Sequence, residues 1–531
     1  MKRSIFIRLA ALLLAALMIS AIAASCAKNT TGAHDTDDDT DTDTDTDTDT
    51  DDVTADIPSD LRFDESGTPT PVRFIVADDL NLSFDTAKRS IEVSEEDKEK
   101  NGVNSAIYER NTVIENRLGV DIIMEKEVYL GTIQDECEEM LAGGIHYYDV
   151  VGGGLYITGM AIGDKAGSYL NFGKLQDEED CYIDLEKKYW AKELTDTMSY
   201  AGASYWITGD ASLYYVGGTY VTFVNARLWT NYAEKIKEIT GYTNVYDVIN
   251  NGKWTIDNMC KIAREVWIDN NNNEKVDKED QAGYISIDYY DLKALAGGFH
   301  IALTKWVDGK PQVDMKNEKV VGYYEKVHNL LDNSNTYIYD DFDFYNQTTP
   351  YVLALFAGGN FLFCIDHLFN SEKYLNDMKD DYYVIPCPMY DEAQFTQFGY
   401  STNLFDGTTL YTIPYTIEDL ACVSATLELM GAKSHEIVTP AYYETALKTR
   451  YVRGDVNAAA QTIDIVREGL YYDFTYLYNI HINSIFDWIT SGMVGTNSRS
   501  ITSAIESKSK VTNKALESFL AKLEASTEVE K

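Results

Sequence analysis

The sequence predicts an α/β protein of two lobes, each a mixed sheet flanked by helices. The chain has 531 residues, and chains beyond about 250–300 residues usually divide into more than one core. From about residue 69 onward, short apolar runs alternate with segments of helical periodicity, which is typical of strands connected by helices. Hydrophobic residues make up 45% of the chain, enough to fill two such cores.

The first lobe is predicted from strands and helices in alternation. The run PVRFIVADD, residues 71–79, indicates a buried strand that ends in two acids. In residues 104–124, apolar side chains recur at helical spacing, Gly119 ends the helix, and VDIIM begins a second strand. The segment IQDECEEMLAGG is helical, and HYYDVVGGG is a strand that runs into three glycines. The apolar positions of the first helix are Ile107, Val113, Ile114 and Leu118.

The second lobe is expected to start within or after residues 205–229. WTIDNMCKIAREVW predicts an amphipathic helix with Thr255 as its N-cap, and Trp254 before it is expected to be a packing anchor. FAGGNFLFCID and YYVIPCPMY predict two more buried strands, and the chain from about Thr416 is mainly helical. We therefore predict a first lobe of residues 69–214, rejoined at about 380–435, and a second of residues 215–379 with about 436–531.

The N-terminus has the order of a lipoprotein signal peptide, predicted for residues 1–25. Lys2, Arg3 and Arg8 precede an apolar stretch, residues 9–24, that is shorter than the roughly 20 residues needed to span a bilayer. It ends in AASC, which resembles a bacterial lipobox with Cys26 as the lipidated residue. An ordinary small-residue cleavage site with an incidental cysteine is the alternative.

Residues 26–68 are predicted to be a disordered tether. The tract is rich in alternating Asp and Thr and has few large apolar residues to seed a core, and its carboxylates repel one another. A calcium-binding aspartate tract is the other interpretation.

The whole chain has a net charge of −41, so it should repel phosphate backbones, and we expect no nucleic-acid partner. The six cysteines after Cys26 form no CxxC pair, and no disulfide is predicted.

The stretch IDNNNNEKVDKEDQ, residues 268–281, has the spacing of a single calcium loop. Calcium takes six to eight oxygen ligands, and positions one, three, five, seven, nine and twelve of such a loop supply them. Two departures weaken the match: Glu274 stands where glycine is usual, and position twelve is an aspartate rather than a glutamate. A solvated asparagine-rich turn is the alternative. The predicted ligands are Asp269, Asn271, Asn273, Lys275 through its carbonyl, Asp277 and Asp280.

Several stretches in this order resemble the extracellular solute-binding lipoproteins of bacterial ABC importers, of the carbohydrate type. They include AIYERNTVIENRLGVDI, YDVVGGG, ITGDASL, NNGKWTIDNM, FAGGNFLFCID, YYVIPCPMYDEAQ and VTPAYYETALKTRYVRGD. The resemblance implies a two-lobed periplasmic-binding-protein-like fold with a ligand cleft between the lobes. It also implies a carbohydrate ligand, a calcium loop after the WT helix, and ABC transporter membrane subunits as partners. We expect a monomer, anchored by lipid at the extracellular face of the cell membrane.

Ligand-binding residues are predicted at strand ends and on neighbouring aromatic side chains. In parallel sheets ligands bind at the carboxyl ends of the strands. Carboxylates and free backbone N–H groups can bind sugar hydroxyls, and tyrosine can cover the apolar face of a sugar. With the lobe arrangement that the resemblance implies, the candidates are Asp79, Gly153, Tyr156, Asp210, Tyr289 and Asp366. Each also has a purely structural alternative: the aspartates can cap turns or a helix, the glycine can serve its turn, and the tyrosines can lie at the surface or in the core.

Three functions compete at this level. The first is a solute receptor without chemistry of its own, and the second is a surface glycosidase or lyase, for which acids are abundant but no motif is present. Neither HExxH, GxSxG nor a P-loop occurs. The third is an adhesive surface protein, which the alternating α/β pattern disfavours. The sequence favours a receptor that is not an enzyme.

Replacement of Cys26 by Ala tests the anchor. Because Cys26 is the predicted lipid attachment point, the variant should leave the membrane fraction when cells are fractionated, while the wild-type chain stays with it. An unchanged distribution between the fractions would contradict lipidation at this residue.

Overall fold

The computed structural model describes residues 54–78, 86–129, 131–162, 167–175, 178–287, 290–339, 348–448, 456–492 and 501–528. The chain divides into two compact units, Met1–Asp49 and Thr50–Lys531. All elements below belong to the second unit. The predicted leader, Cys26 and the tether up to residue 53 lie outside the described residues, so these predictions stay open. Residues 54–68 were also predicted to be disordered, and this is wrong: Ile57 is buried in the core, and the N–H of Phe63 donates to the carbonyl of Leu118 at 2.7 Å.

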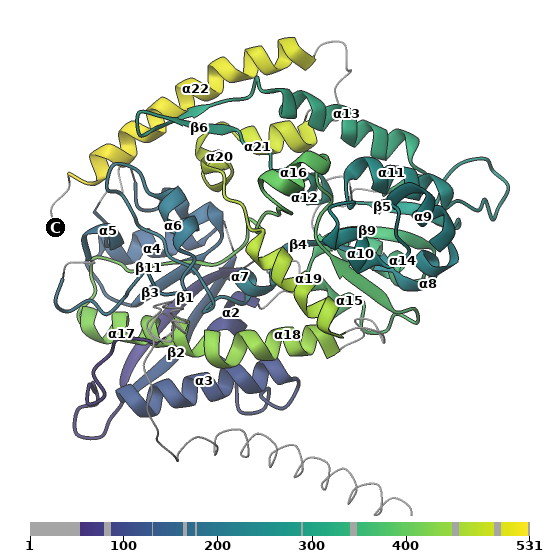
Figure 1. Cartoon of the computed structure of the whole chain (residues 1–531). Coiled ribbons are helices and arrows are strands. Elements are labelled where there is room, and N and C mark those ends of the chain that lie inside the picture. The colour runs from purple at the N-terminus through teal and green to yellow at the C-terminus, as the bar shows by residue number, and fades with distance from the viewer. Residues whose placement is uncertain are drawn as a thin grey trace, which may run out of the picture. The chain divides into compact units, whose positions relative to one another are not determined.

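The first sheet has four strands in the order β11–β3–β1–β2 (Figure 1). They are β1 (Thr70–Asp78), β2 (Val120–Tyr129), β3 (Val150–Gly153) and β11 (Leu410–Thr412). β1 pairs in parallel with β2 and β3, whereas β11 is antiparallel to β3. Alternate residues of β1 enter different cores, Phe74 and Val76 on one face and Ile75 and Ala77 on the other, as a sheet covered on both faces requires.

The predicted first helix is confirmed as α3 (Gly102–Leu118). The Asn101 side chain accepts the N–H of Asn104 at 2.8 Å, and Gly119 ends the helix with a φ of 70°, in the left-handed region. Val113 does not join the buried face: it is 37% exposed, because Ile114 beside it already faces the core. Other helices of this part are α2 (Thr86–Ile91), α4 (Ile133–Ala142), α5 (Phe172–Leu175), α6 (Lys192–Met198) and α17 (Leu420–Lys433).

The second sheet has five strands in the order β10–β4–β9–β5–β8. They are β4 (Tyr220–Asn225), β5 (Ala282–Ser286), β8 (Thr336–Ile338), β9 (Phe361–His367) and β10 (Tyr382–Ile385). β4 runs antiparallel to β10 and β9, and β5 runs parallel to β9 and β8, so the sheet is mixed. The predicted strands FLFCID and YYVI are confirmed as β9 and β10.

Helices cover this second sheet, and this part of the chain also contains a separate two-stranded hairpin. The hairpin consists of β6 (Thr304–Val307) and β7 (Lys310–Val313). In α11 (Ile256–Glu265), Thr255 is the N-cap as predicted, and Trp254 is fully buried with its indole N–H on the carbonyl of Pro386 at 2.9 Å. The remaining helices are α8 (Ala226–Asn231), α9 (Ala233–Thr240), α10 (Val245–Asn250), α12 (Tyr290–Gly298), α13 (Glu318–Asn333), α14 (Thr348–Ala357), α15 (Asn370–Tyr374) and α16 (Glu392–Gln397).

Two crossover segments connect the sheets and lie side by side. One leads from α7 (Leu213–Gly217) into β4, and the other leads from β10 to β11. The N–H of Phe405 donates to the carbonyl of Gly218 at 3.0 Å, and the N–H of Leu368, after β9, donates to Thr219 at 3.0 Å. Because β10 is in the second sheet and β11 in the first, the chain returns between residues 385 and 410, slightly later than the sequence suggested.

The C-terminal part is helical, as predicted. It contains η5 (Ser434–Val438), α18 (Thr439–Lys448), α19 (Val456–Glu468), α20 (Phe474–Leu477), η6 (Asn479–His481), α21 (Ile485–Asp487), η7 (Trp488–Gly492) and α22 (Ile501–Ser526). The long α22, yellow in Figure 1, reaches both parts of the fold: Ser509 contacts Met315 after β7, and Glu524 accepts a hydrogen bond from Tyr200 at 2.8 Å. Within the described ranges, no helix has both the length and the apolar composition to cross a membrane. The six cysteines that the structure describes are free thiols.

A buried carboxylate, Glu428 of α17, lies behind the first sheet. It accepts hydrogen bonds from the Tyr189 hydroxyl, from the indole N–H of Trp190 at 2.8 Å and from the N–H of Asp184 at 3.2 Å. Burial outweighs these donors and raises the pKa of Glu428 to about 7. The folded chain therefore keeps a proton on Glu428 over a pH range in which the unfolded chain has lost it.

This proton should make the protein less stable as the pH rises. The contribution of this proton to the free energy of unfolding is fully present below the usual glutamate pKa of 4.5 and is lost as the pH rises through about 7. It corresponds to a loss on the order of 2–3 kcal/mol in the free energy of unfolding. Thermal unfolding at pH 5 and pH 8 should show a smaller pH dependence for Glu428→Gln than for the wild type. Equal dependence in both proteins would refute the assignment.

Candidate functional site

Two predicted ligand residues flank the edge where the first sheet meets the second lobe. Gly153 ends β3, and Tyr156 lies in the adjoining 3-10 helix η3 (Leu155–Gly159). A Cβ atom on Gly154 would lie 2.7 Å from the carbonyl oxygen of Asp406, so only glycine permits this close approach. The N–H of Leu155 donates to that same carbonyl at 2.8 Å. Asp79 and Tyr289 lie outside the described residues.

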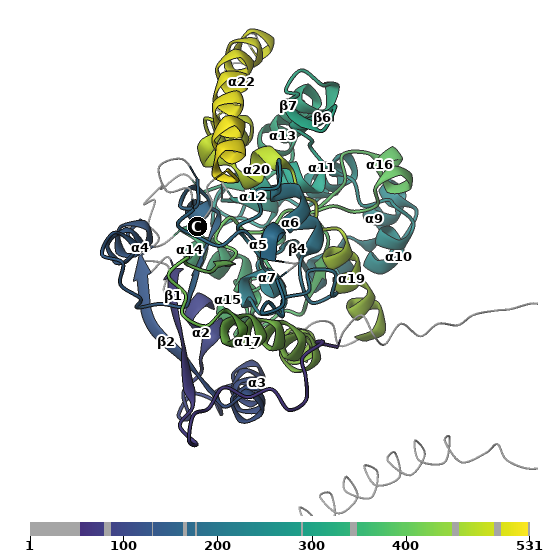
Figure 2. The same ribbon diagram turned by 90° about the vertical axis from the view of Figure 1, so that its left-hand side faces the viewer.

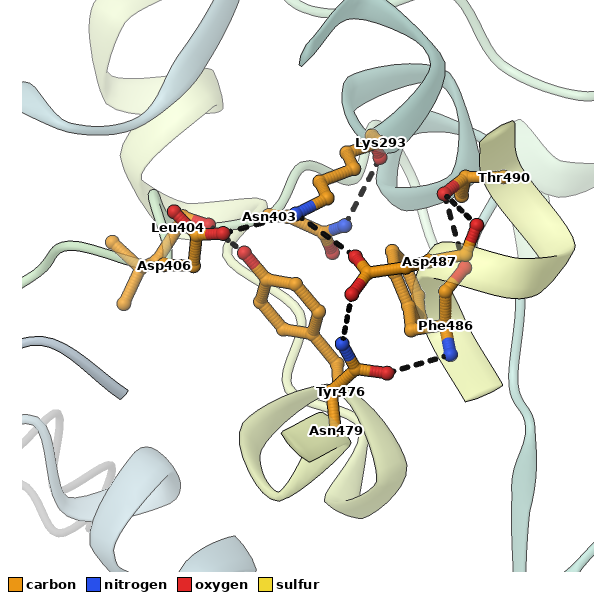
Figure 3. A network of polar contacts seen from close by, with 9 residues as sticks. All are labelled: Lys293, Asn403, Leu404, Asp406, Tyr476, Asn479, Phe486, Asp487 and Thr490. Atoms are coloured by element: carbon orange, nitrogen blue, oxygen red, sulfur yellow. Dashed lines mark hydrogen bonds and ion pairs between the residues drawn. The ribbon is translucent and has the colours of Figure 1, made fainter. Parts of the chain in front are cut away.

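The ammonium of Lys293 joins elements of both lobes at this edge (Figure 3). Lys293 comes from α12 of the second lobe and is 2% exposed. Its Nζ lies 2.9 Å from a carboxylate oxygen of Asp406, before β11 of the first sheet, and 3.0 Å from one of Asp487 in α21. Two carboxylates around one buried ammonium leave a net negative charge, and a buried charge is stable only when it is paired in this way.

Three hydrogen bonds hold Lys293 and the residues around it in place. Asn479 donates to Asp487 at 2.6 Å, Asn403 donates to the Lys293 carbonyl at 3.1 Å, and the hydroxyl of Tyr476 donates to the Leu404 carbonyl at 2.5 Å (Figure 3). The cavity among these groups has a volume of about 30 Å³. That is about the share of one water molecule in the liquid, so the cavity has no room for a larger ligand in this conformation.

Asp210 belongs to a second polar group between the lobes. It is 1% exposed, and its oxygens contact the guanidinium of Arg467 in α19 at 2.6 Å and Nδ1 of His435 in η5 at 2.5 Å. A cavity of about 270 Å³ adjoins it, lined among others by Trp190, Tyr215 and Arg467. Asp210 is therefore engaged in an ion pair with Arg467 and a hydrogen bond with His435, both from distant segments, and ligand contact there stays a prediction.

Asp366 lies in the hinge rather than at an open surface. It is fully buried at the end of β9, where it accepts the N–H of His367 at 2.7 Å, Nδ1 of His367 at 2.9 Å and the Asn370 amide at 2.9 Å. The rings of Phe369 and Phe405 pack against His367. A sugar could touch Asp366 only after this aromatic cluster has moved, so its predicted role stays open.

The predicted calcium loop forms a closed turn. An isolated bridge between Ile268 and Gln281 closes it. Asp269, at position one, accepts the N–H groups of Asn273 at 3.2 Å and Glu274 at 2.8 Å. Glu274 adopts a φ of 60°, the left-handed conformation for which glycine is usual, so the turn forms without glycine.

The side chains of two other predicted ligands, Asn271 and Asn273, contact Asp277. One of its oxygens accepts the amides of Asn271 at 2.8 Å and Asn273 at 2.6 Å. Asp280, at position twelve, is fully buried and accepts the N–H groups of Asn270 and Asp277. No three His, Cys, Asp or Glu side chains form a ready-made metal group in the described part of the chain. The donors fit calcium chemically, but binding would require the two amides to present oxygen to the ion.

Sequence reasoning missed Lys293, Asp406, Asp487, Arg467 and His435. Only Lys293 left a local signal: it is one cation among apolar residues in DLKALAGG, and a buried lysine needs a partner. The others come together through pairs separated by more than 100 residues, such as Lys293 and Asp406 or Asp210 and Arg467. No spacing in the sequence reveals such pairs.

No family model and no curated protein matches the chain. Several solved structures are similar to it in fold. The sugar-binding protein MalE of Xanthomonas citri matches with a TM-score of 0.50 and 11% identity, over 85% of this chain and 98% of that one. The ABC substrate-binding protein Lmo0181 of Listeria monocytogenes, solved with cycloalternan, matches with a TM-score of 0.48 and 11% identity, over 85% and 99%. The maltodextrin-binding domain MalE of Bdellovibrio bacteriovorus, bound to maltotriose, matches with 0.47 and 12%, over 85% and 100%.

The chain therefore has the two-lobed α/β fold of periplasmic binding proteins, as the sequence predicted. Each lobe is a mixed sheet flanked by helices, and the polar groups around Lys293 lie where the two lobes meet.

Proposed function

We propose that the protein is a lipid-anchored receptor that captures a neutral carbohydrate between its lobes and delivers it to an ABC transporter. The observation that carries this proposal is the contact of Lys293 in the second lobe with Asp406 in the first. It makes the seam between the lobes polar, with both donors and acceptors. The sugar-binding names of structures with this fold support the ligand class.

The chemistry of the seam suits an uncharged polyol. Asp406 and Asp487 can accept hydrogen bonds from sugar hydroxyls, and Lys293 and Asn479 can donate to them. An anionic sugar would meet a chain of net charge −41 and, at this seam, two carboxylates for one ammonium. Because the polar groups at the seam come from both lobes, a sugar bound there favours the conformation in which both lobes touch it.

The alternative, a glycan-active enzyme, needs two facing carboxylates with room for the substrate between them. Asp406 and Asp487 share the Lys293 ammonium, and the cavity between them is about 30 Å³. This arrangement favours binding and release by lobe movement. Anchoring through Cys26 would keep the receptor near its transporter, and a tether would let it turn.

A thermal-shift screen against neutral oligosaccharides tests the receptor, with chromatography of each mixture to detect cleavage. We expect at least one sugar to raise the melting temperature and to be recovered intact. Asp79→Ala with Tyr289→Ala should weaken its binding at least tenfold, whereas Val511→Ala, 56% exposed on α22, should not. Cleavage products would establish the enzyme instead, and the absence of any stabilising sugar would contradict the proposal.

We also propose that the loop from Asp269 to Asp280 binds calcium as a structural ion. The loop offers Asp269, Asn271, Asn273, Asp277 and Asp280 as oxygen donors together with the Lys275 carbonyl, and it already has a closed turn. Calcium would replace the amide N–H groups that now face Asp277. Outside the cell calcium is plentiful, so such a loop needs no sensing role.

Chelation should lower the melting temperature, because a ligand of the folded state stabilises it by RT ln(1 + [L]/Kd). At a calcium concentration of 100 Kd, this amounts to about 2.7 kcal/mol. Asp269→Ala with Asp277→Ala should remove the response to chelator, while deletion of the Asp/Thr tract should leave it intact. If the loop variant still responds and the deletion does not, the tract is the calcium site.

A further inference from the structure

A further cavity lies on the first lobe alone, away from the seam. It has a volume of about 550 Å³ and is formed by β1, β2, α4 and the loop that leads into β3. Arg73 lies near the start of β1, and the loop precedes the start of β3, so the cavity faces the amino ends of these strands. Leu155, in contrast, follows the carboxyl end of β3. In Figure 2, α4 and β2 lie at the edge of the molecule opposite α9 and α10.

Arg73 brings unused hydrogen-bond donors to this cavity. Its backbone N–H donates to Asp149 at 2.6 Å, but its guanidinium has no ion-pair partner among the residues that the structure describes. The cavity nevertheless contains Glu125, Glu136 and Glu139, of which Glu136 is paired with Lys126 at 2.5 Å. A partly buried arginine that forms no bond to nearby carboxylates is positioned to donate to a ligand.

His146 supplies a second unused polar atom. Its Nε2 lies 2.6 Å from Asp149, which fixes the ring, and its side chain is only 12% exposed. Its Nδ1 is buried and has no hydrogen-bond partner within the described ranges. When Nε2 carries the proton toward Asp149, Nδ1 is a hydrogen-bond acceptor. Nδ1 is closed to solvent, so a ligand in the cavity reaches it only when the side chains around it move.

Aromatic rings complete the lining. Tyr147 is 53% exposed, and its ring centre lies 6.2 Å from that of the buried Tyr148. An exposed tyrosine at the mouth of a polar cavity offers a flat apolar face with a hydroxyl at its edge.

We propose that this cavity is a second carbohydrate site, which binds one or two units of a neutral glycan. A pyranose presents hydroxyls that both donate and accept around an apolar face of C–H groups. Arg73 can donate to these hydroxyls, Glu139 can accept from them, and Tyr147 can cover the apolar face. The three glutamates disfavour an anion, and Arg73 and Lys126 disfavour a cation.

Such a site could hold a glycan at times when the seam between the lobes is open. Because it is formed by one lobe, it needs no lobe closure and can hold part of a long chain while the seam opens and closes. Two sites on one tethered body raise the effective concentration of the glycan at the receptor. The inference stands on the chemistry of the cavity and does not require the seam to bind sugar.

Native affinity electrophoresis of the full chain tests the site. The gels contain amylopectin, galactomannan, xyloglucan or mixed-linkage β-glucan, with polygalacturonate as the anionic control. We expect at least one neutral polysaccharide to reduce the mobility of the wild-type chain at least twofold. Tyr147→Ala and Arg73→Gln should each restore the mobility, whereas Trp306→Ala, an aromatic residue 48% exposed on β6, should not.

Lys293→Met separates this site from the seam, because it removes the ion pairs with Asp406 and Asp487 at the seam and none of the residues that line the cavity. A retarded Lys293→Met chain, together with mobile Tyr147→Ala and Arg73→Gln chains of normal melting temperature, supports the proposal. Retardation that survives both cavity variants overturns it, as does a wild-type chain that no neutral polysaccharide retards. Retardation by polygalacturonate alone overturns it too, because the ligand would then be an anion.

Discussion

The two lobes depend on one short contact between crossover segments. The chain enters β4 through Gly218 and Thr219 and leaves the second sheet through Leu404 and Phe405. Thr219 pairs antiparallel with Leu404, and Phe405 donates to Gly218 at 3.0 Å. A Cβ atom on Gly218 would collide with the carbonyl oxygen of Tyr214, so the crossover needs glycine at this point.

This contact places the candidate site. The turn that follows Phe405, before β11, brings Asp406 to the edge of the first sheet, beside η3, and Asp406 then meets Lys293 of the second lobe at 2.9 Å. A rotation about the crossovers would change the distance between these two residues more than any distance inside one lobe. The polar seam and the hinge are therefore parts of one arrangement, in which the site is complete only when the lobes meet.

The sequence predicted the local structure well and the long-range structure poorly. Gly119 ends α3, Thr255 begins α11 and Trp254 is buried, because these features depend on neighbours in the chain. Val113 fits the helical period but faces solvent, since periodicity does not say how wide the buried face is. The fold class followed from the order of segments.

The site could be predicted only in outline. Gly153 ends β3 as the sequence pattern predicted, and its contact with a ligand stays a prediction, whereas Asp366, chosen by the same reasoning, is fully buried in the hinge. Strand-end position does not tell whether a side chain points to solvent or into an aromatic cluster. Lys293 and Arg467 find their carboxylates more than 100 residues away, and such pairs arise only when the chain has folded.

Lobe closure is the central claim, and the distance between the lobes tests it most directly. Spin labels at Val113, exposed on α3, and at Lys237, exposed on α9, would report it by double electron–electron resonance, with Cys181 replaced by Ser. We predict a longer and broader distance distribution without sugar, and a shorter, narrower one with a stabilising oligosaccharide. A sugar that binds with full affinity and leaves the distribution unchanged would contradict the account.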